Sequence, residues 1–288
     1  MGVFSKSKAN NNGQQKKEDP ENKEKTGEEK EMSFLEHLEE LRWHLMRSII
    51  AILLVGIVLF INIQWFIADV VLAPMQSDFP TNEILSRLRG LDVAESIQVM
   101  IIAITPYEQF LRALTVSAIG GFIFSFPYII WEIWRFIKPG LHNNEKKGLR
   151  GNVVVMSLLF FIGISFSYFI ITPFALQFFS TFQIMEGVEN QWRIGNIIAM
   201  ITQIAIAGGL IFEMPIIVYY LSKIGLLTPE IMKAYRRHAI VVLLILAAII
   251  TPPDWITQIL IFIPLTLLYE TSIRISAMVA RKREAALA

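Results

Sequence analysis

Long apolar runs alternate with short polar segments through most of this chain of 288 residues. The first four of the six longest runs each hold about 20 residues or more, the length at which a helix crosses about 30 Å of hydrocarbon. The six predicted spans are 48–68, 111–131, 152–172, 196–220, 238–250 and 255–275. This pattern predicts an all-α membrane protein with six transmembrane helices.

The last two runs differ from the first four. The run 238–250 would reach only about 20 Å as a helix, which is too short for an ordinary bilayer. Pro264 interrupts the run 255–275, and charged residues follow it closely. We therefore expect a hairpin of short fifth and sixth helices, joined by a tight turn, that spans where the bilayer is thinned or where flanking polar residues snorkel.

Lysine and arginine are concentrated in one set of connecting segments. They are frequent before the first run, after the second, after the fourth and after the sixth, whereas the opposite set holds only Arg87, Arg89 and Arg193. By the positive-inside rule, both termini should lie in the cytoplasm, with six crossings between them.

The chain begins with a polar stretch. Residues 1–31 mix Lys and Glu with Asn, Gln and Gly, which predicts a disordered cytoplasmic tail ahead of a transmembrane domain over 32–288. Ser33 and Glu36 then match a capping box, so a helix should begin there. Leucines at three- and four-residue steps follow, as expected for an amphipathic helix on a membrane surface.

Two connecting segments on the outer side carry apolar residues. Residues 69–105 form the longest one, and its apolar pieces predict a folded cap with short helices. In the second segment, Pro173 should end the third helix. Four phenylalanines follow it and are expected to pack against the cap or the bilayer interface: Phe174, Phe178, Phe179 and Phe182.

Composition excludes most enzyme classes. The chain is 54% hydrophobic and 18% charged, has a mean hydropathy of +0.51 and contains no cysteine. The four histidines lie at helix ends or in connecting segments, and neither H-E-x-x-H nor a phosphate-binding G-x-x-x-x-G-K-[ST] occurs. We expect a protein without catalytic residues, metal or cofactor and without a nucleic-acid partner, in contact with membrane lipids, whose work is driven by a partner or an ion gradient.

Glu213 is the residue most indicative of function. It lies within the fourth run, roughly 13 Å from the predicted cytoplasmic end, where a carboxyl group is costly unless it faces protein or water. Pro215 should kink the helix close to it. A functional contact is one interpretation, and a structural pairing with a neighbouring helix is the other. Gln203 and Gln258 are weaker candidates, because amides find local partners easily.

Two other local patterns have ordinary structural interpretations. Gly208 and Gly209 permit close packing of the fourth helix against a neighbour. Glu132 and Arg135 stand one helical turn apart near the cytoplasmic interface, where they should form an ion pair.

Short fragments occur in a fixed order relative to the six spans. They are His37-Leu-Glu-Glu-Leu-Arg42, Ala73-Pro74, Pro139-Gly-Leu141 with Glu145, Phe212-Glu-Met-Pro215, Leu227-Thr-Pro-Glu230 and Thr251-Pro-Pro-Asp254. Together they resemble the TatC family, the polytopic signal-peptide-receptor subunit of the twin-arginine (Sec-independent) protein translocase, over about 33–276. The resemblance implies cytoplasmic termini, short fifth and sixth helices and a concave, glove-like bundle.

The resemblance also implies a function. TatC proteins bind the twin-arginine signal peptides of folded precursor proteins and recruit single-span partner subunits of the TatA and TatB type for export driven by the proton motive force. The chain is accordingly expected in the bacterial cytoplasmic (inner) membrane, within a receptor complex that holds several copies of it.

Site residues follow from the matched fragments. Glu40 and Glu145 match the acids that bind the paired arginines, and Arg42 and Phe136 match positions near them. Fixed, fork-shaped guanidinium groups require such carboxylates. The residues that match contacts with signal-peptide or partner helices are Glu213, Gln258 and Asp254.

Three features depart from the family pattern. His44 stands where a second basic residue is common, the polar tail is long, and so is the first outer segment. The competing prediction is an ion-coupled secondary transporter with Glu213 as its ion site, which should show paired inverted repeats that this sequence lacks. A membrane scaffold without a site would leave Glu213 and the acidic N-terminal helix unexplained.

Overall fold

The computed structural model describes residues 34–89, 99–137, 149–183, 185, 190–250 and 255–287. The predicted tail 1–31 lies outside the described residues, as does the turn at 251–254. The chain divides into two compact units, Met1–Leu41 and Arg42–Ala288. The packing described below is that of the second unit.

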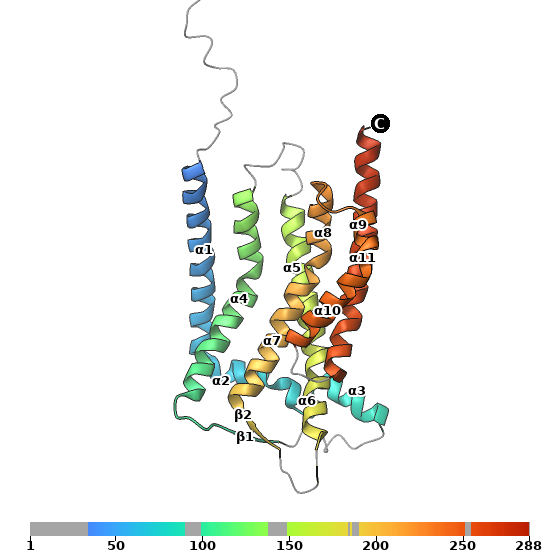
Figure 1. The fold of residues 1–288 in the computed structure, drawn as a ribbon. Helices are drawn as coiled ribbons and strands as arrows, with labels where there is room; N and C mark the ends of the chain where they lie inside the picture. Colours follow the sequence, from blue (N-terminus) through green and yellow to red (C-terminus); the bar gives the residue numbers. More distant parts are fainter. Residues whose placement is uncertain are drawn as a thin grey trace, which may run out of the picture. The chain divides into compact units, whose positions relative to one another are not determined.

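Helices make up nearly all of the described chain (Figure 1). In chain order the elements are α1 (Phe34–Ile61), α2 (Ile63–Trp65), the π-helix η2 (Phe66–Val71), the 3-10 helix η3 (Ala73–Met75), α3 (Pro80–Arg89), β1 (Met100–Ile102), α4 (Glu108–Ile137), α5 (Leu149–Phe166), the π-helix η7 (Ser167–Ile171), α6 (Thr172–Thr181), β2 (Gln191–Arg193), α7 (Ile194–Phe212), α8 (Met214–Lys223), α9 (Pro229–Ala234), α10 (Arg236–Ile250) and α11 (Trp255–Leu287).

Five helical stretches among the described residues are long and apolar enough to cross a membrane. They are Leu38–Ile61, Glu108–Ile137, Gly151–Thr181, Ile194–Lys223 and Thr257–Arg283. They correspond to the first four predicted spans and the sixth. Helix α10 has only 15 residues, about 22 Å, so the prediction of a short fifth helix is confirmed.

The prediction of a short sixth helix is wrong. Helix α11 runs for 33 residues and passes through Pro264 without ending. Its polar second half remains helical because it packs on its neighbours. Ile273 is buried in one cluster with Val218 of α8 and Met232 of α9, and the hydroxyl groups of Ser276 and Ser222 lie 2.8 Å apart.

The prediction that Pro173 ends the third helix is wrong. The wide turn η7 shifts the hydrogen-bond register, so that the N–H of Thr172 donates to the carbonyl of Ser167. Pro173 then falls in the first turn of α6, where a missing N–H costs little. The helical stretch therefore continues to Thr181.

Side-chain hydroxyl groups donate hydrogen bonds to two backbone carbonyls, each of which lies four residues before a proline. Val70 precedes Pro74 by four residues and accepts a hydrogen bond from the hydroxyl of Tyr168. Phe169 precedes Pro173 by four residues and accepts one from the hydroxyl of Thr81. Because a proline has no N–H to donate to its i−4 carbonyl, these two bonds tie the segment after α1 to the third helical stretch.

The described part of the first long connecting segment is folded, as predicted. The side-chain amide of Asn82 donates to the carbonyls of Pro74 and Gln76, both at 2.9 Å. The Phe79 ring stacks on that of Phe169, with centroids 5.4 Å apart, and meets Tyr168 edge-on at 5.6 Å. We call the end of the bundle that carries α3, β1 and β2 the cap end.

A two-stranded ribbon at the cap end was not predicted. Strands β1 and β2 pair in parallel, with Met100 opposite Gln191 and Ile102 opposite Arg193. Three-residue strands are too short to show the alternation of apolar and polar residues by which strands are recognised. The all-α class thus holds apart from this ribbon, which joins the two connecting segments.

Glycines allow close helix crossings. A Cβ atom on Gly208 of α7 would stand 1.7 Å from the Ser167 hydroxyl oxygen, and one on Gly121 of α4 would stand 2.5 Å from the Ile52 carbonyl oxygen of α1. Helices can approach this closely only where no side chain intervenes. The predicted packing role of Gly208 and Gly209 is confirmed.

Replacing Thr81 by valine should lower the free energy of unfolding by about 1–2 kcal/mol, because the carbonyl of Phe169 loses a donor in apolar surroundings. Equilibrium unfolding of the purified protein in detergent measures this. Thr115→Val is the matched control, since the Thr115 hydroxyl donates within its own helix to Leu111. Equal effects of the two substitutions would contradict the assignment.

Candidate functional site

Glu213 lies at a break between two helices. Its backbone N–H caps the end of α7 through the carbonyl of Leu210 at 3.2 Å, and its own carbonyl accepts the N–H of Ile217 at 3.1 Å. Helix α8 begins at the next residue, with Pro215 in its first turn. The kink predicted from Pro215 is therefore confirmed.

The Glu213 side chain is buried and lacks a hydrogen-bond partner. Only 4% of the residue is exposed, and neither carboxylate oxygen has a partner among the described residues. The structural pairing considered for it is therefore not found in that part of the chain. A carboxyl group left in this state costs free energy that a partner outside the chain could recover.

Helical spacing indicates which neighbours Glu213 faces. Gly209, one turn earlier, packs so tightly that a Cβ atom would stand 2.7 Å from the Phe160 ring of α5. Tyr220, two turns later, contacts Trp134 of α4 with ring centroids 4.7 Å apart. Residues four and seven apart share one helix face. Glu213 thus lies on the face that packs against α4 and α5.

The two glutamines behave as expected for amides. Gln203 donates to the carbonyl of Ile249 at 3.0 Å, and Gln258 donates to that of Leu244 at 3.3 Å. Both acceptors belong to α10. Gln258 therefore helps to hold the α10–α11 hairpin, whatever further contact it makes.

A hydrogen-bonded pair buried between α1 and α4 was not predicted. The Nδ1 atom of His44 and the Oε2 atom of Glu132 are hydrogen-bonded, and the two residues are 6% and 2% exposed. Arg47 lies one turn further along α1, with its guanidinium 3.9 Å from the same carboxylate oxygen. The predicted pair of Glu132 with Arg135 is wrong, because Glu132 points to α1 and Arg135 stays exposed.

Phe136 belongs to the same cluster. Its ring meets that of His44 edge-on, with centroids 6.2 Å apart. The sequence contains a signal for the pairing of His44 with Glu132. Consecutive antiparallel helices place the start of the first span and the end of the second at one membrane level, so an acid in one requires a partner in the other.

The remaining predicted site residues are only partly described. Glu40 and Arg42 lie in α1, and Arg42 is exposed. Glu40 belongs to the unit Met1–Leu41, which is described by itself. Glu145 and Asp254 lie outside the described residues. The juxtaposition of Glu40 with Glu145 stays a prediction.

Two further charged clusters had no counterpart in the sequence analysis. Arg236 of α10 and Glu270 of α11 form a two-pronged pair, with Nε–Oε1 and Nη2–Oε2 distances of 2.9 and 3.0 Å. Glu108 is 5% exposed at the start of α4, where it accepts the N–H of Ile104 at 3.1 Å and faces Arg193 at 3.4 Å. Nothing local in the sequence links residues so far apart.

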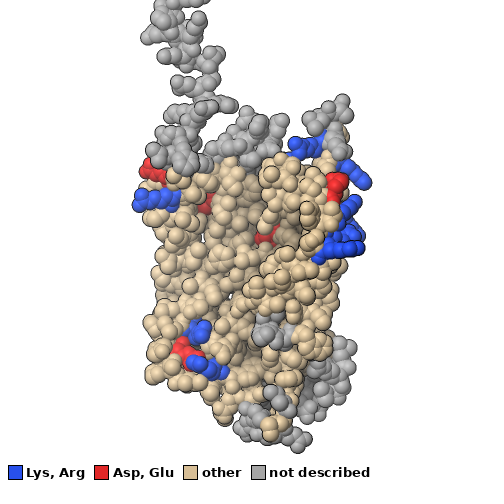
Figure 2. Space-filling model, viewed as in Figure 1, with Lys and Arg blue, Asp and Glu red and all other residues tan. Residues whose placement is uncertain are grey.

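Side chains that could ligate a metal ion are not clustered in the described part of the chain. Within the described ranges, no group of three or more His, Cys, Asp or Glu side chains could hold a metal ion. Figure 2 shows a surface that is mostly tan, with blue and red atoms in a few groups at its margins and isolated red atoms between them. These features define the class: a polytopic α-helical membrane protein with a buried carboxyl group at a helix break.

Comparison with known proteins gives the family. The sequence model of TatC, described as Sec-independent protein translocase protein, matches residues 36–264. The TatC protein of Blattabacterium sp. subsp. Periplaneta americana is 37% identical over 89% of this chain and 99% of its own length. That of Halalkalibacterium halodurans is 32% identical over 88% of this chain and 92% of its own length.

A solved structure agrees. A crystal structure of a twin-arginine translocase receptor, TatC, superposes with a TM-score of 0.68 at 33% identity, covering 84% of this chain and 99% of that one. The chain belongs to the TatC family. It is a component of the twin-arginine translocase, integral to the bacterial inner membrane, and not a catalytic enzyme. Family membership leaves the ion-coupled transporter without support.

Single replacements of His44 or Glu132 by alanine should each lower the free energy of unfolding by about 2–4 kcal/mol, because each leaves a buried polar group without its partner. The double variant should lose less than the sum, with a coupling energy of about 1–3 kcal/mol. Unfolding of all four proteins in one detergent gives this cycle.

Arg135→Ala is the control for that cycle. Its side chain is exposed, so the expected change is below about 0.5 kcal/mol. Additive single effects, or a larger loss from Arg135→Ala than from His44→Ala, would contradict the pairing between α1 and α4.

Proposed function

We propose that this protein is the receptor subunit that binds twin-arginine signal peptides of folded precursor proteins on the cytoplasmic side of the membrane. The observation that carries the proposal is the similarity, over most of both chains, to a TatC structure described as the twin-arginine translocase receptor. Single-span partner subunits, of the TatA and TatB type, then join the complex for export driven by the proton motive force.

In this proposal Glu40 and Glu145 bind the paired arginines. A guanidinium group keeps its charge at any physiological pH and presents donors in a fork that matches a carboxylate. Two separate carboxylates therefore select two adjacent arginines over lysines, which lack the fork. Arg42 and Phe136 border the site in the sequence pattern.

The buried cluster between α1 and α4 supports a fixed receptor surface. His44 is hydrogen-bonded to Glu132 and contacts the Phe136 ring. The position of this ring is therefore supported by a fixed neighbour before a peptide binds. The carboxylate of Glu132 presents no charge to solvent, since this residue is 2% exposed.

Glu213 supports the second half of the proposal, the recruitment of helices within the membrane. Its carboxyl group is buried and has no partner in the described part of the chain. A polar group on a signal-peptide or partner helix would gain a hydrogen bond there that lipid cannot provide. Gln258 and Asp254 are proposed to extend this contact toward the outer turn.

The proposed topology has both termini in the cytoplasm and six crossings, with the α10–α11 hairpin supplying the last two. Helix α10 would cross at about 22 Å, which requires local thinning of the bilayer. Residues 1–31 form a polar tail, and residues 32–288 form a concave, glove-like bundle that assembles with further copies of itself.

A precursor with a twin-arginine signal peptide should crosslink to the protein in membranes, and its Lys-Lys variant should crosslink much less. Glu40→Ala and Glu145→Ala should each reduce the arginine crosslink about tenfold, the effect of losing one charge-assisted hydrogen bond of about 1.5 kcal/mol. The yield of photo-crosslinked product measures this.

Glu39→Ala is the matched control, because Glu39 is the neighbouring acid of α1 on a different face of the helix. It should leave the crosslink unchanged. Equal labelling of the Arg-Arg and Lys-Lys precursors, or full labelling of both alanine variants, would sink the receptor proposal.

Glu213→Leu should have opposite effects on stability and on assembly. The free energy of unfolding should rise by about 1–3 kcal/mol, because an unpartnered buried carboxyl group is removed. Co-purification of single-span partners should fall, because their polar contact is lost. Both are measured on the same membrane preparation.

Glu108→Leu is the matched control for stability. Glu108 is equally buried but has partners in Ile104 and Arg193, so the same substitution should destabilise by about 2–4 kcal/mol. A stability loss with Glu213→Leu would mean that the carboxyl group has a structural partner, and unchanged partner recovery would rule out the recruitment role.

A further inference from the structure

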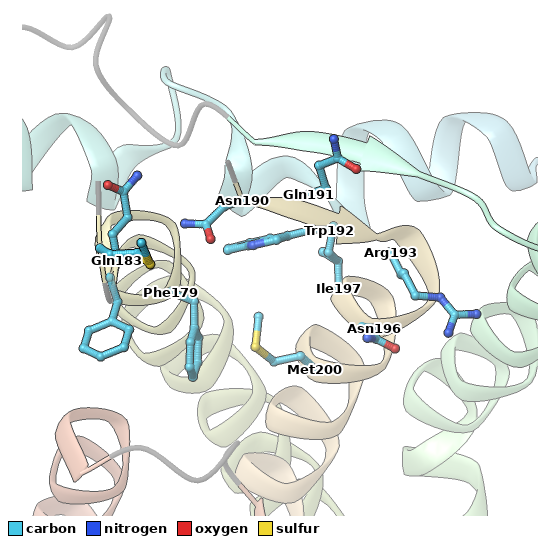
Figure 3. Close-up of a pocket in the computed structure, with 11 residues that line it drawn as sticks. Phe179, Gln183, Asn190, Gln191, Trp192, Arg193, Asn196, Ile197 and Met200 are labelled. Carbon is cyan, nitrogen blue, oxygen red and sulfur yellow. The ribbon is translucent and has the colours of Figure 1, made fainter. Parts of the chain in front are cut away.

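A cavity with almost wholly apolar walls lies inside the bundle, away from every residue used above for binding. Its volume is about 200 Å³, and its walls come from η2, α4, the third helical stretch and α7. A larger cavity of about 740 Å³ lies at the cap end, where Asn190, Gln191 and Asn196 make its wall partly polar (Figure 3). The smaller one, which we call the inner cavity, is the one suited to a purely apolar ligand.

The inner cavity reaches from the packed core to the lipid-facing surface. Val116 of α4 and Ile201 of α7 line it and are 1% and 2% exposed, whereas Phe124 and Phe169 line it and are 54% and 44% exposed. The span Glu108–Ile137 has 30 residues and is therefore about 45 Å long. About 30 Å of hydrocarbon covers roughly its central 20 residues, which include Val116 and Phe124. The cavity therefore opens toward acyl chains and not toward water.

Three described side chains that line the inner cavity carry hydroxyl groups, and two of these already have acceptors in the chain. The hydroxyl of Tyr168 donates to the carbonyl of Val70, and that of Thr202 donates to the carbonyl of Ile198 at 2.6 Å. The third belongs to Ser165, which is exposed. A ligand in the deep part of the cavity therefore gains apolar contacts only. This favours a hydrocarbon chain over an extended peptide, whose amides would lack partners there.

Both π-helices border the inner cavity. Helix η2 contributes Phe66 and Val71 to its wall, and η7 contributes Tyr168 and Phe169. Gly120 of α4 keeps the cavity open between them, because a Cβ atom there would stand only 3.1 Å from the Phe66 ring. Single π-turns within helices are frequent at functional sites. The space between the two π-helices is therefore a candidate binding site and not only a packing fault.

We propose that the inner cavity binds an acyl chain of a membrane lipid, which enters beside Phe124 and Phe169 and ends against Val116 and Ile201. An apolar cavity of about 150 Å³ holds a benzene ring, so a cavity of about 200 Å³ has room for the last carbons of a chain. An empty cavity costs free energy in proportion to its volume, and lipid chains are the apolar molecules present at this depth. The bound chain packs on η2 and η7 and so supports the joint between the cap segment and the third helical stretch.

Photo-labelling of the full-length protein in vesicles tests the site. The probe is a phosphatidylcholine with a diazirine near the end of one acyl chain, and mass spectrometry of peptides locates the labelled residues. Val116 and Ile201 should be labelled although both are buried, because the chain end reaches them. Phe160 and Leu176 are the controls and should stay unlabelled, since they are equally buried but line neither cavity.

Filling the cavity should remove the labelling. Ala205 is buried and lines the inner cavity, so the ring in Ala205→Phe takes the place of the chain and labelling of Val116 and Ile201 should be lost. Leu53→Phe, at an exposed position of α1, is the control and should leave the labelling unchanged. A cooperative thermal transition shows that each variant is folded. Ala205→Leu, which adds less volume and should reduce the labelling in part, replaces the phenylalanine variant if that one does not fold.

The outcomes separate a bound lipid chain from a protein ligand. Absence of labelling at Val116 and Ile201 overturns the proposal and leaves the cavity to a side chain of a partner or of a second copy. Labelling no stronger than that of Phe160 and Leu176, or labelling that persists undiminished in a folded filled variant, overturns it as well. The vesicles contain no signal peptide, so failure of the receptor proposal would not change these results.

Discussion

The backbone of this protein has to find its hydrogen bonds without water. In the hydrocarbon of a membrane an unpaired carbonyl costs several kcal/mol, so departures from a regular helix are tolerated where other groups supply the bond. The chain departs from the helix near Pro74 and Pro173, and the hydroxyl groups of Tyr168 and Thr81 donate to the carbonyls four residues earlier. These two bonds fasten the cap segment to the third helical stretch, and the position of the cap follows from them.

The same constraint makes Glu213 exceptional. At the third break, between α7 and α8, the backbone bonds are made, but the carboxyl group at the break has no partner among the described residues. The amides of Gln203 and Gln258 find acceptors on α10, and threonine hydroxyls such as that of Thr202 donate within their own helix. A polar group that the fold leaves unsatisfied, on a face that otherwise packs tightly, is suited to a contact formed with another molecule.

The sequence predicted what depends on local patterns and missed what depends on distant ones. Hydropathy predicted the first four long spans and the short fifth helix correctly but made the sixth helix too short, and Pro215 predicted the kink beside Glu213. The pairing of Glu132 was assigned to Arg135 because spacing along one helix is visible in sequence, whereas His44 lies 88 residues away. Pro173 predicts a helix end, because a π-turn, which shifts the register, has no clear sequence signature. The β1–β2 ribbon arises from segments that only the fold brings together.

The parallel ribbon also bears on how the protein is made. Met100 pairs with Gln191, about 90 residues further along the chain, and α4, α5 and α6 lie between them. At about 5–20 residues per second of synthesis, β1 waits roughly 5–18 s for its partner strand. The ribbon therefore cannot close before α4, α5 and α6 have been synthesised.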